Sequence, residues 1–247
     1  MLSAVKLYSL LYTQGLWVAS RAKRLPEPMG PRAGRVGNGP VLRLLIFGDS
    51  SAVGVGVAHQ DDALSGCLSR ALAKDFTVDW TLLAKTGATS GSALQTLEGL
   101  TGPFDLAFIA LGVNDAKNGV RTATWARNME TILNRLATHH DCQMVGVSGL
   151  PPVDRFPLLP NPLRDTLAAR ARKFDQRLQQ IAAKFPPCVF LRTHLNGLEG
   201  HMAEDGFHPG AKIYQRWADE SVAVFHNAGL RERLASAASK EQHTRSA

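Results

Sequence analysis

The chain has 247 residues, of which 45% are hydrophobic and 20% are charged. These values exclude a disordered or fibrous chain and are typical of one globular domain with a single large core. The formal net charge of +7 is concentrated near the N-terminus, because residues 1–40 carry six basic side chains against the single acid Glu27. The rest is nearly neutral and lacks the basic, aromatic-interleaved face that nucleic-acid binding requires.

The first twenty residues carry polar side chains at helical spacing within an apolar sequence. Lys6, Ser9 and Thr13 are three or four residues apart, so they form one narrow stripe on a helix. Polar residues and a glycine at 13–15 break the apolar run, which leaves it shorter than the roughly 18 residues that a membrane-spanning helix needs. We therefore expect an amphipathic helix that does not cross a bilayer.

Three interpretations of this helix stay open. Because three basic side chains follow within residues 21–24, the pattern favours peripheral association of residues 1–24 with anionic lipid. A signal peptide is the second interpretation, since Lys6 precedes an apolar stretch that ends near Ser20. A helix packed on its own domain is the third. We expect a cytoplasmic protein or one peripheral at the membrane, with export less favoured.

Residues 26–40 contain four prolines and four glycines, which predicts a linker. From Val41 onward, apolar runs alternate with stretches of helical periodicity. The apolar runs are 41–47, 76–84, 104–111, 142–149 and 187–192, and the helical stretches lie near 61–74, 90–99, 121–140, 163–184 and 210–228. This alternation predicts a single doubly wound, five-stranded parallel sheet with helices on both faces, of flavodoxin-like type. The predicted divisions are an arm and linker at 1–40, a domain at 41–230 and a polar tail at 231–247.

Residues that can carry chemistry follow three of the predicted strands. Gly48-Asp49-Ser50 comes directly after the first strand, Gly87 lies in the loop after the second, and Asn114 follows the third. Ligands of parallel sheets bind at the carboxyl ends of the strands, where the strand order reverses. We expect these residues to meet there.

The last loop adds Asp205-x-x-His208. A serine hydroxyl is a poor nucleophile unless an imidazole takes its proton and a carboxylate orients that imidazole. Ser50, His208 and Asp205 supply these three groups. We favour His208 over His194 and His201 because an acid precedes it by three residues.

Together these motifs resemble the four signature blocks of the GDSL, or SGNH, hydrolase family over residues 41–228. The blocks are Gly48-Asp49-Ser50, Gly87, Gly112-x-Asn114-Asp115 and Asp205-x-x-His208. The resemblance implies a serine hydrolase of the SGNH type, with an α/β fold, that needs no cofactor.

The resemblance also assigns roles to individual residues. It implies Ser50 as nucleophile, His208 as general base and Asp205 as its orienting acid. It implies an oxyanion hole made by the N–H groups of Ser50 and Gly87 and the amide of Asn114. The family often has leucine and then serine after the nucleophile, whereas Ser51-Ala52 follows here; we expect altered packing and an unaltered mechanism.

Three further polar residues have structural interpretations. We expect Asp49 and Asp115 to accept backbone N–H bonds and hold their loops. Ser148 is not in a Gly-x-Ser-x-Gly turn, so we expect it to be structural.

The proline-rich stretch 150–163 exposes apolar side chains that a simple loop would not carry. We interpret Phe156, Leu158 and Leu159 as a wall of an acyl pocket; a loop that merely covers the core is nearly as consistent with the pattern.

The cysteines and histidines predict no metal site. Cys67, Cys142 and Cys188 are odd in number and widely spaced, which argues against a disulfide framework, and their spacing does not fit zinc.

The sequence therefore predicts a serine hydrolase that cleaves esters or thioesters of aliphatic acyl chains through an acyl-enzyme on Ser50. The expected partner is a small-molecule or lipid ester, and the oligomeric state is left open. One alternative is a carbohydrate O-acetylesterase of the same family. It is less favoured because few tryptophan or tyrosine residues lie near the motifs to stack on sugar rings. Another is a non-catalytic, flavodoxin-like binding module, which leaves Asp205-x-x-His208 without a purpose.

Overall fold

A computed structural model describes residues 4–193, 196–197 and 199–245 of the chain. Within them, one six-stranded sheet has the order β1-β3-β2-β4-β5-β6. The strands are β1 (Ala33–Val36), β2 (Val41–Gly48), β3 (Thr77–Ala84), β4 (Leu106–Ala110), β5 (Met144–Ser148) and β6 (Cys188–Leu191). Strands β2 to β6 are parallel and match the five predicted apolar runs, while β1 is antiparallel to β3.

The predicted strand count is one too low, because β1 arises from the segment interpreted as linker. Its four residues, Ala33–Val36, include a glycine and contain no apolar run. The free edge of β3 supplies the pairing, with Ala33 opposite Thr81 and Val36 opposite Val78. Gly34 fits here because a Cβ would stand only 3.0 Å from the indole nitrogen of Trp80. Pro31 is tolerated shortly before β1, because an edge strand pairs on one side only and a residue there need not donate a backbone hydrogen bond.

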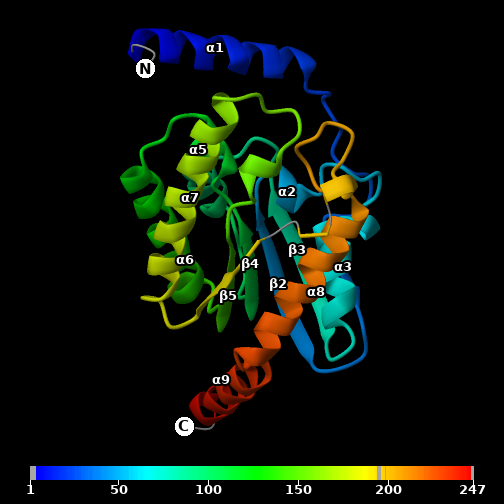
Figure 1. The fold of residues 1–247 in the computed structure, drawn as a ribbon. Coiled ribbons are helices and arrows are strands. Elements are labelled where there is room, and N and C mark those ends of the chain that lie inside the picture. Colours follow the sequence, from blue (N-terminus) through cyan, green and yellow to red (C-terminus); the bar gives the residue numbers. More distant parts are fainter. Residues whose placement is uncertain (1–3, 194–195, 198, 246–247) are drawn as a thin grey trace.

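Helices cover both faces of the sheet (Figure 1). They are α1 (Ala4–Arg21), α2 (Ser50–Val53), α3 (Leu64–Leu72), α4 (Ser90–Leu97), α5 (Val113–Lys117), α6 (Thr122–His139), α7 (Leu163–Ala182), α8 (Ala211–Asn227) and α9 (Leu230–Arg245). The core on one face is formed with α4, α6 and α7, and the core on the other face with α3 and α8.

The alternation along β2 shows why the strands are continuous apolar runs. Leu45 and Phe47 enter the core beneath α6 and α7, whereas Leu44 and Ile46 enter the core beneath α3 and α8. All four are 1% exposed or less. Because both faces of the strand are buried, its side chains are mainly apolar; the exception, Arg43 near the start of the strand, pairs with Asp105 at 2.6 Å.

The strand order reverses at β2, because β3 lies on one side of β2 and β4 on the other; this is the switch point of the sheet. Helix α1 crosses above the carboxyl ends of the strands, and α9 extends from the opposite end of the molecule (Figure 1). Residues 231–245, predicted as a polar tail, are helical. Among the described residues, no helix is both long enough and apolar enough to traverse a bilayer.

Candidate active site

Ser50 lies where β2 passes directly into α2. Strand β2 ends at Gly48, where a Cβ would stand 2.2 Å from the carbonyl oxygen of Ala110, so only glycine fits. Asp49 is the N-cap of α2, and its Oδ1 accepts from the N–H of Ser51 at 3.0 Å and from its hydroxyl at 2.8 Å. Ser50 is therefore the first residue of a capped helix at the switch of the sheet.

The structure brings Ser50 together with His208 and Asp205. The Ser50 Oγ lies 2.9 Å from Nε2 of His208, and the His208 Nδ1 lies 2.5 Å from Oδ2 of Asp205. Oδ1 of Asp205 accepts from the backbone N–H groups of Phe207, at 2.9 Å, and of His208, at 3.0 Å. The carboxylate of Asp205 thus holds both the ring and the backbone N–H of His208, which fixes the orientation of the imidazole.

Asp205 is suited to remain ionised. It is only 5% exposed, and burial alone would raise its pKa. The hydrogen bonds from the ring and N–H of His208 and from the N–H of Phe207 outweigh burial and hold the pKa of Asp205 below its ordinary value. A carboxylate of this kind favours a proton on the facing imidazole nitrogen, which leaves Nε2 free to accept the proton of Ser50.

Gly56 allows the histidine loop to close on the segment after α2. A Cβ at Gly56 would stand 2.2 Å from the carbonyl oxygen of Pro209 and 3.3 Å from Cβ of His208, and its φ of +114° also favours glycine. The buried hydroxyl of Tyr214 donates to the carbonyl of Val55 at 2.7 Å and holds the same segment from α8. We did not predict these roles; the only sequence signal is a glycine six residues after Ser50.

The three residues predicted for an oxyanion hole follow β2, β3 and β4; Ser50 and Asn114 line one cavity, whereas Gly87 is not among its lining residues although its neighbour Thr86 is. In the part of the chain that the structure describes, no hydrogen bond involves the N–H groups of Ser50 and Gly87. Asn114 is 7% exposed, and its Nδ2 donates to the carbonyl of Ala88 at 3.1 Å and to Oδ2 of Asp49 at a longer 3.4 Å. The longer bond is the one that a substrate oxyanion could replace.

Asp49 and Asp115 hold loops, as predicted. Oδ2 of Asp115 accepts from the N–H of Ser90 at 2.8 Å, and Oδ1 accepts from its hydroxyl at 2.7 Å, so the start of α4 is fixed behind Asn114. Burial raises the pKa of Asp115 and of Asp49, although the bonds from Ser90 and Ser51 oppose the rise. Each carboxylate thus accepts hydrogen bonds from one backbone N–H and one serine hydroxyl of the protein itself, which is a structural role.

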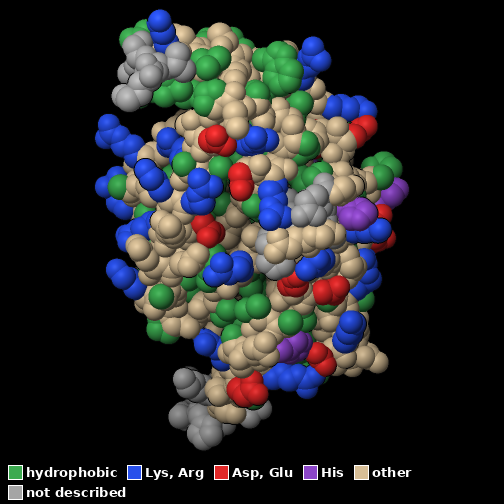
Figure 2. All heavy atoms as spheres, in the orientation of Figure 1, with side chains coloured by type: hydrophobic (Ala, Val, Ile, Leu, Met, Phe, Trp, Pro, Cys, Tyr) green, Lys and Arg blue, Asp and Glu red, His purple; other side chains and the backbone are tan. Residues whose placement is uncertain are grey.

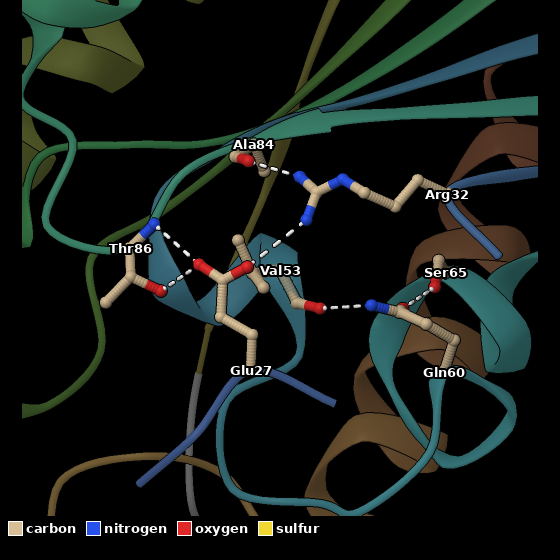
Figure 3. A network of polar contacts seen from close by, with 7 residues as sticks. All are labelled: Glu27, Arg32, Val53, Gln60, Ser65, Ala84 and Thr86. Carbon is tan, nitrogen blue, oxygen red and sulfur yellow. Dashed lines mark hydrogen bonds and ion pairs between the residues drawn. The ribbon is translucent and has the colours of Figure 1, made fainter. Parts of the chain in front are cut away.

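The segment between α1 and β1, residues 22–32, also contacts the loop of Gly87; we call it the strap. Oε1 of Glu27 accepts from the hydroxyl of Thr86 at 2.6 Å and from its N–H at 3.3 Å, while Oε2 pairs with Arg32 at 3.3 Å (Figure 3). Arg32 in turn donates to the carbonyl of Ala84. Glu27 therefore fixes the residue directly before Gly87, a role that no motif in the sequence indicated.

A second contact in Figure 3 fixes the far end of α2. Gln60 is 3% exposed, its Nε2 donates to the carbonyl of Val53 at 3.0 Å, and its Oε1 accepts from the hydroxyl of Ser65 at 2.6 Å. The helix that begins with Ser50 is thereby held against α3.

The hydrogen-bonded residues open into a cavity of about 850 Å³. Ser50, Asn114 and His208 line it, and so do Phe156 and Leu159 from the proline-rich stretch. Leu158 is a correction: it is absent from the lining and lies beside Gly206, because the short helix Val153–Arg155 and the turn after it direct Phe156 and Leu159 inward instead. Two of the three residues predicted for the cavity wall, Phe156 and Leu159, therefore line it.

Other nucleophiles are disfavoured. Burial raises the pKa of the Cys142 and Cys188 thiols to about 12, so neither supplies a thiolate near neutral pH. Ser148 lines the cavity, but its hydroxyl lies 3.0 Å from that of Thr193 and has no imidazole partner among the residues that the structure describes. His194 lies outside the described residues, and within them no group of three metal-binding side chains occurs.

An acid, an imidazole and a hydroxyl in line at the switch of a doubly wound sheet are the arrangement of a serine hydrolase. Residues 46–216 match the model of the GDSL-like Lipase/Acylhydrolase family. The chain is 30% identical over 231 residues to a GDSL-like esterase of Mycobacterium tuberculosis, an alignment covering 83% of this chain and 72% of that protein.

Solved structures share the fold. TesA is 21% identical with a TM-score of 0.61, over 75% of this chain and 99% of TesA. The lipase/acylhydrolase from Enterococcus faecalis is 20% identical with a TM-score of 0.61, over 76% of this chain and 96% of that one. The chain belongs to the GDSL-like lipase/acylhydrolase family, and it is a hydrolase that acts on ester bonds.

Proposed function

We propose that the protein hydrolyses carboxylic esters or thioesters of aliphatic acyl chains through a covalent acyl-enzyme on Ser50. The observation that carries this proposal is the hydrogen-bonded series Asp205–His208–Ser50, at 2.5 and 2.9 Å, opening into a largely apolar cavity. The apolar walls, which include Phe156 and Leu159, favour an acyl chain over a sugar ring.

In the proposed reaction, Oγ of Ser50 attacks the substrate carbonyl carbon while Nε2 of His208 takes the hydroxyl proton. The carbonyl oxygen becomes an oxyanion that accepts from the N–H groups of Ser50 and Gly87 and from the amide of Asn114. His208 then gives its proton to the leaving alcohol or thiol, and the acyl group stays on Ser50. Each oxyanion donor is expected to contribute roughly 10²- to 10³-fold in rate.

Water completes the cycle. His208 accepts a proton from a water molecule, which attacks the acyl-enzyme, and the same three donors hold the second oxyanion. The proton passes to Oγ of Ser50 as the carboxylic acid leaves. Asp205 stays ionised throughout and stabilises the imidazolium that forms in each half-reaction.

Labelling with a fluorophosphonate tests the nucleophile. The wild-type protein should gain one covalent adduct by mass spectrometry, and Ser50→Ala should gain none. Ser148→Ala is the matched control, because Ser148 lines the same cavity and its hydroxyl pairs with Thr193 rather than with His208; this variant should be labelled as wild type. Equal labelling of Ser50→Ala and wild type would remove Ser50 from its role.

A panel of esters with graded acyl length tests the substrate class. We expect kcat/KM to rise with chain length, by roughly fourfold per added methylene until the cavity is filled, since each buried methylene contributes about 0.8 kcal/mol. Ser50→Ala should be inactive on every ester. A preference for acetylated sugars, with no gain from longer chains, would contradict the aliphatic assignment.

A further inference from the structure

Helix α1 forms a roof over the candidate active site. Leu11, Gly15 and Val18 recur at steps of three or four on one face of the helix, and all line the cavity that contains Ser50, as does Ala22 directly after the helix. Figure 1 shows α1 lying across the carboxyl ends of the strands. A substrate that reaches Ser50 must therefore pass beside this helix.

Two polar attachments of the roof involve Gln14 and Lys23. Gln14 donates from Nε2 to the carbonyl of Asn161 at 2.6 Å, and its Oε1 accepts from the N–H of Leu163 at 3.0 Å. At the other end, Lys23 pairs with Glu204 at 2.6 Å, but both side chains are about 60% exposed (61% and 59%). Exposed ion pairs contribute little, so of these two attachments the pair of bonds made by Gln14 is the stronger.

A second stripe of α1 is apolar and faces outward. Val5, Tyr8, Tyr12 and Leu16 are spaced by three or four residues and are 74%, 72%, 69% and 55% exposed. Among the large hydrophobic side chains that the described part of the chain exposes, only two lie outside α1. Figure 2 shows hydrophobic side chains gathered along the upper edge of the molecule, where α1 lies.

The outer stripe is continuous with the cavity. Tyr12 and Leu16 belong to the exposed stripe and also line the cavity that reaches Ser50. An apolar path therefore runs from the surface, along one edge of α1, to the nucleophile. This continuity distinguishes α1 from an ordinary amphipathic helix, whose outer face is polar.

The charges on and after α1 indicate which apolar partner fits. Helix α1 contains no acidic side chain, and it ends at Arg21, followed by Lys23 and Arg24. The guanidinium of Arg21 lies 5.5 Å from the ring centre of Trp17, an aromatic–basic pair suited to the boundary between headgroups and acyl chains. An apolar stripe flanked by cations matches an anionic lipid surface.

We propose that α1 is a lid that binds anionic lipid surfaces through its Val5–Leu16 stripe and admits acyl chains along that edge to Ser50. This inference rests on the proposed function, and it adds where the substrate comes from and what moves. Lipid would supply contacts for Tyr12 and Leu16, so that α1 could release the bonds of Gln14 and turn its apolar edge into the surface.

Vesicle flotation with the full-length protein tests the surface. Wild type should bind phosphatidylcholine vesicles containing phosphatidylglycerol and bind pure phosphatidylcholine more weakly. Val5→Ser with Tyr8→Ser, neither of which lines the cavity, should weaken binding at least about tenfold, since each removes an apolar side chain from the surface. Val41→Ser is the matched control, because Val41 is also an exposed apolar residue, 52% exposed, but lies at the start of β2, at the end of the strand away from Ser50 and α1.

The same variants separate this inference from the proposed function. The double variant should hydrolyse a short soluble ester at the wild-type rate but lose most hydrolysis of a long-chain ester carried in anionic vesicles. Wild-type vesicle binding by the double variant would overturn the inference. So would a protein that ignores vesicles and instead forms a dimer that the two substitutions dissociate. Failure of all variants on the short ester would contradict the proposed function instead.

Gln14→Ala tests whether α1 moves. Loss of both attachments should raise hydrolysis of a dispersed long-chain ester several-fold without vesicles and reduce the stimulation that vesicles give, with the short-ester rate unchanged. If α1 were a fixed wall of the pocket, the variant would lower long-chain hydrolysis, and that result would overturn the lid.

Discussion

At the scale of single residues, the site depends on one carboxylate that makes three hydrogen bonds. Asp205 accepts from the ring of His208 and from two backbone N–H groups, so it sets both the position and the tautomer of the imidazole. Neighbouring acids do different work: Asp49 caps α2, and Asp115 fixes the start of α4. Three aspartates near the nucleophile thus have separate roles that their contacts define.

Asp205→Asn should lower kcat by roughly 10²- to 10⁴-fold with little change in KM, because an amide can leave the imidazole in the wrong tautomer. The pKa of Asp205 is depressed in the folded state, so its ionised form stabilises the protein above the unfolded pKa, and this contribution is lost as pH falls through the folded pKa. The difference in unfolding free energy between wild type and variant should therefore shrink below about pH 4.

Steady-state kinetics and denaturant unfolding at several pH values measure these effects. Asp61→Asn is the control, because Asp61 is an exposed acid on the short helix Gln60–Asp62. A wild-type kcat in Asp205→Asn would show that His208 needs no orienting carboxylate.

At the scale of elements, the strap connects the lid to the loop of Gly87. It begins after α1, passes Glu27 and ends at β1, and it is also paired with the loop after α2 through Met29 and Gln60. One segment outside the family match therefore touches both the loop of Gly87 and the loop that follows α2. We propose Glu27 as a positioning residue, because it contacts Thr86, the residue directly before Gly87.

Glu27→Ala should lower kcat about tenfold with KM nearly unchanged, because a displaced Gly87 N–H weakens one oxyanion donor. Glu27→Gln retains an oxygen that accepts from Thr86 and should recover most of the loss. Kinetics and thermal unfolding of both variants check this expectation. A lowered melting temperature with an unchanged kcat in Glu27→Ala would mean that Glu27 only anchors the strap.

At the scale of the whole molecule, the N-terminal region consists of two parts with different energetic importance. Helix α1 lies outside the sheet and is attached through the bonds of Gln14 and the packing of Val18 against the core, whereas β1 completes the ladder beside β3 and covers Trp80. Removing α1 should leave the core intact. Removing β1 as well should expose the edge of a buried sheet.

Deletion of residues 1–22 should therefore change the melting temperature by only a few degrees. Deletion of residues 1–38 should lower it by roughly 10 °C, since a lost ladder of about three hydrogen bonds contributes about 3 kcal/mol in a domain of this size. Differential scanning calorimetry of the two truncations measures the difference. Equal melting temperatures would show that β1 contributes nothing to stability.

How far the sequence could predict this protein depends on whether a feature is local. The apolar runs predicted β2 to β6, because strands buried on both faces are mainly apolar, and residues at their carboxyl ends predicted where Ser50 and Asn114 meet. Asp205 and His208 were found because three residues of spacing already place an acid beside an imidazole.

Other features needed a partner from far along the chain. Strand β1 has no apolar pattern of its own and exists because β3 has a free edge. Gly56, Glu27 and the turn that moves Leu158 out of the cavity wall acquire meaning only from the segments packed against them. The helical period of residues 4–21 indicated an amphipathic helix, but only the tertiary structure placed that helix over Ser50, because packing between distant segments is not encoded in any local pattern.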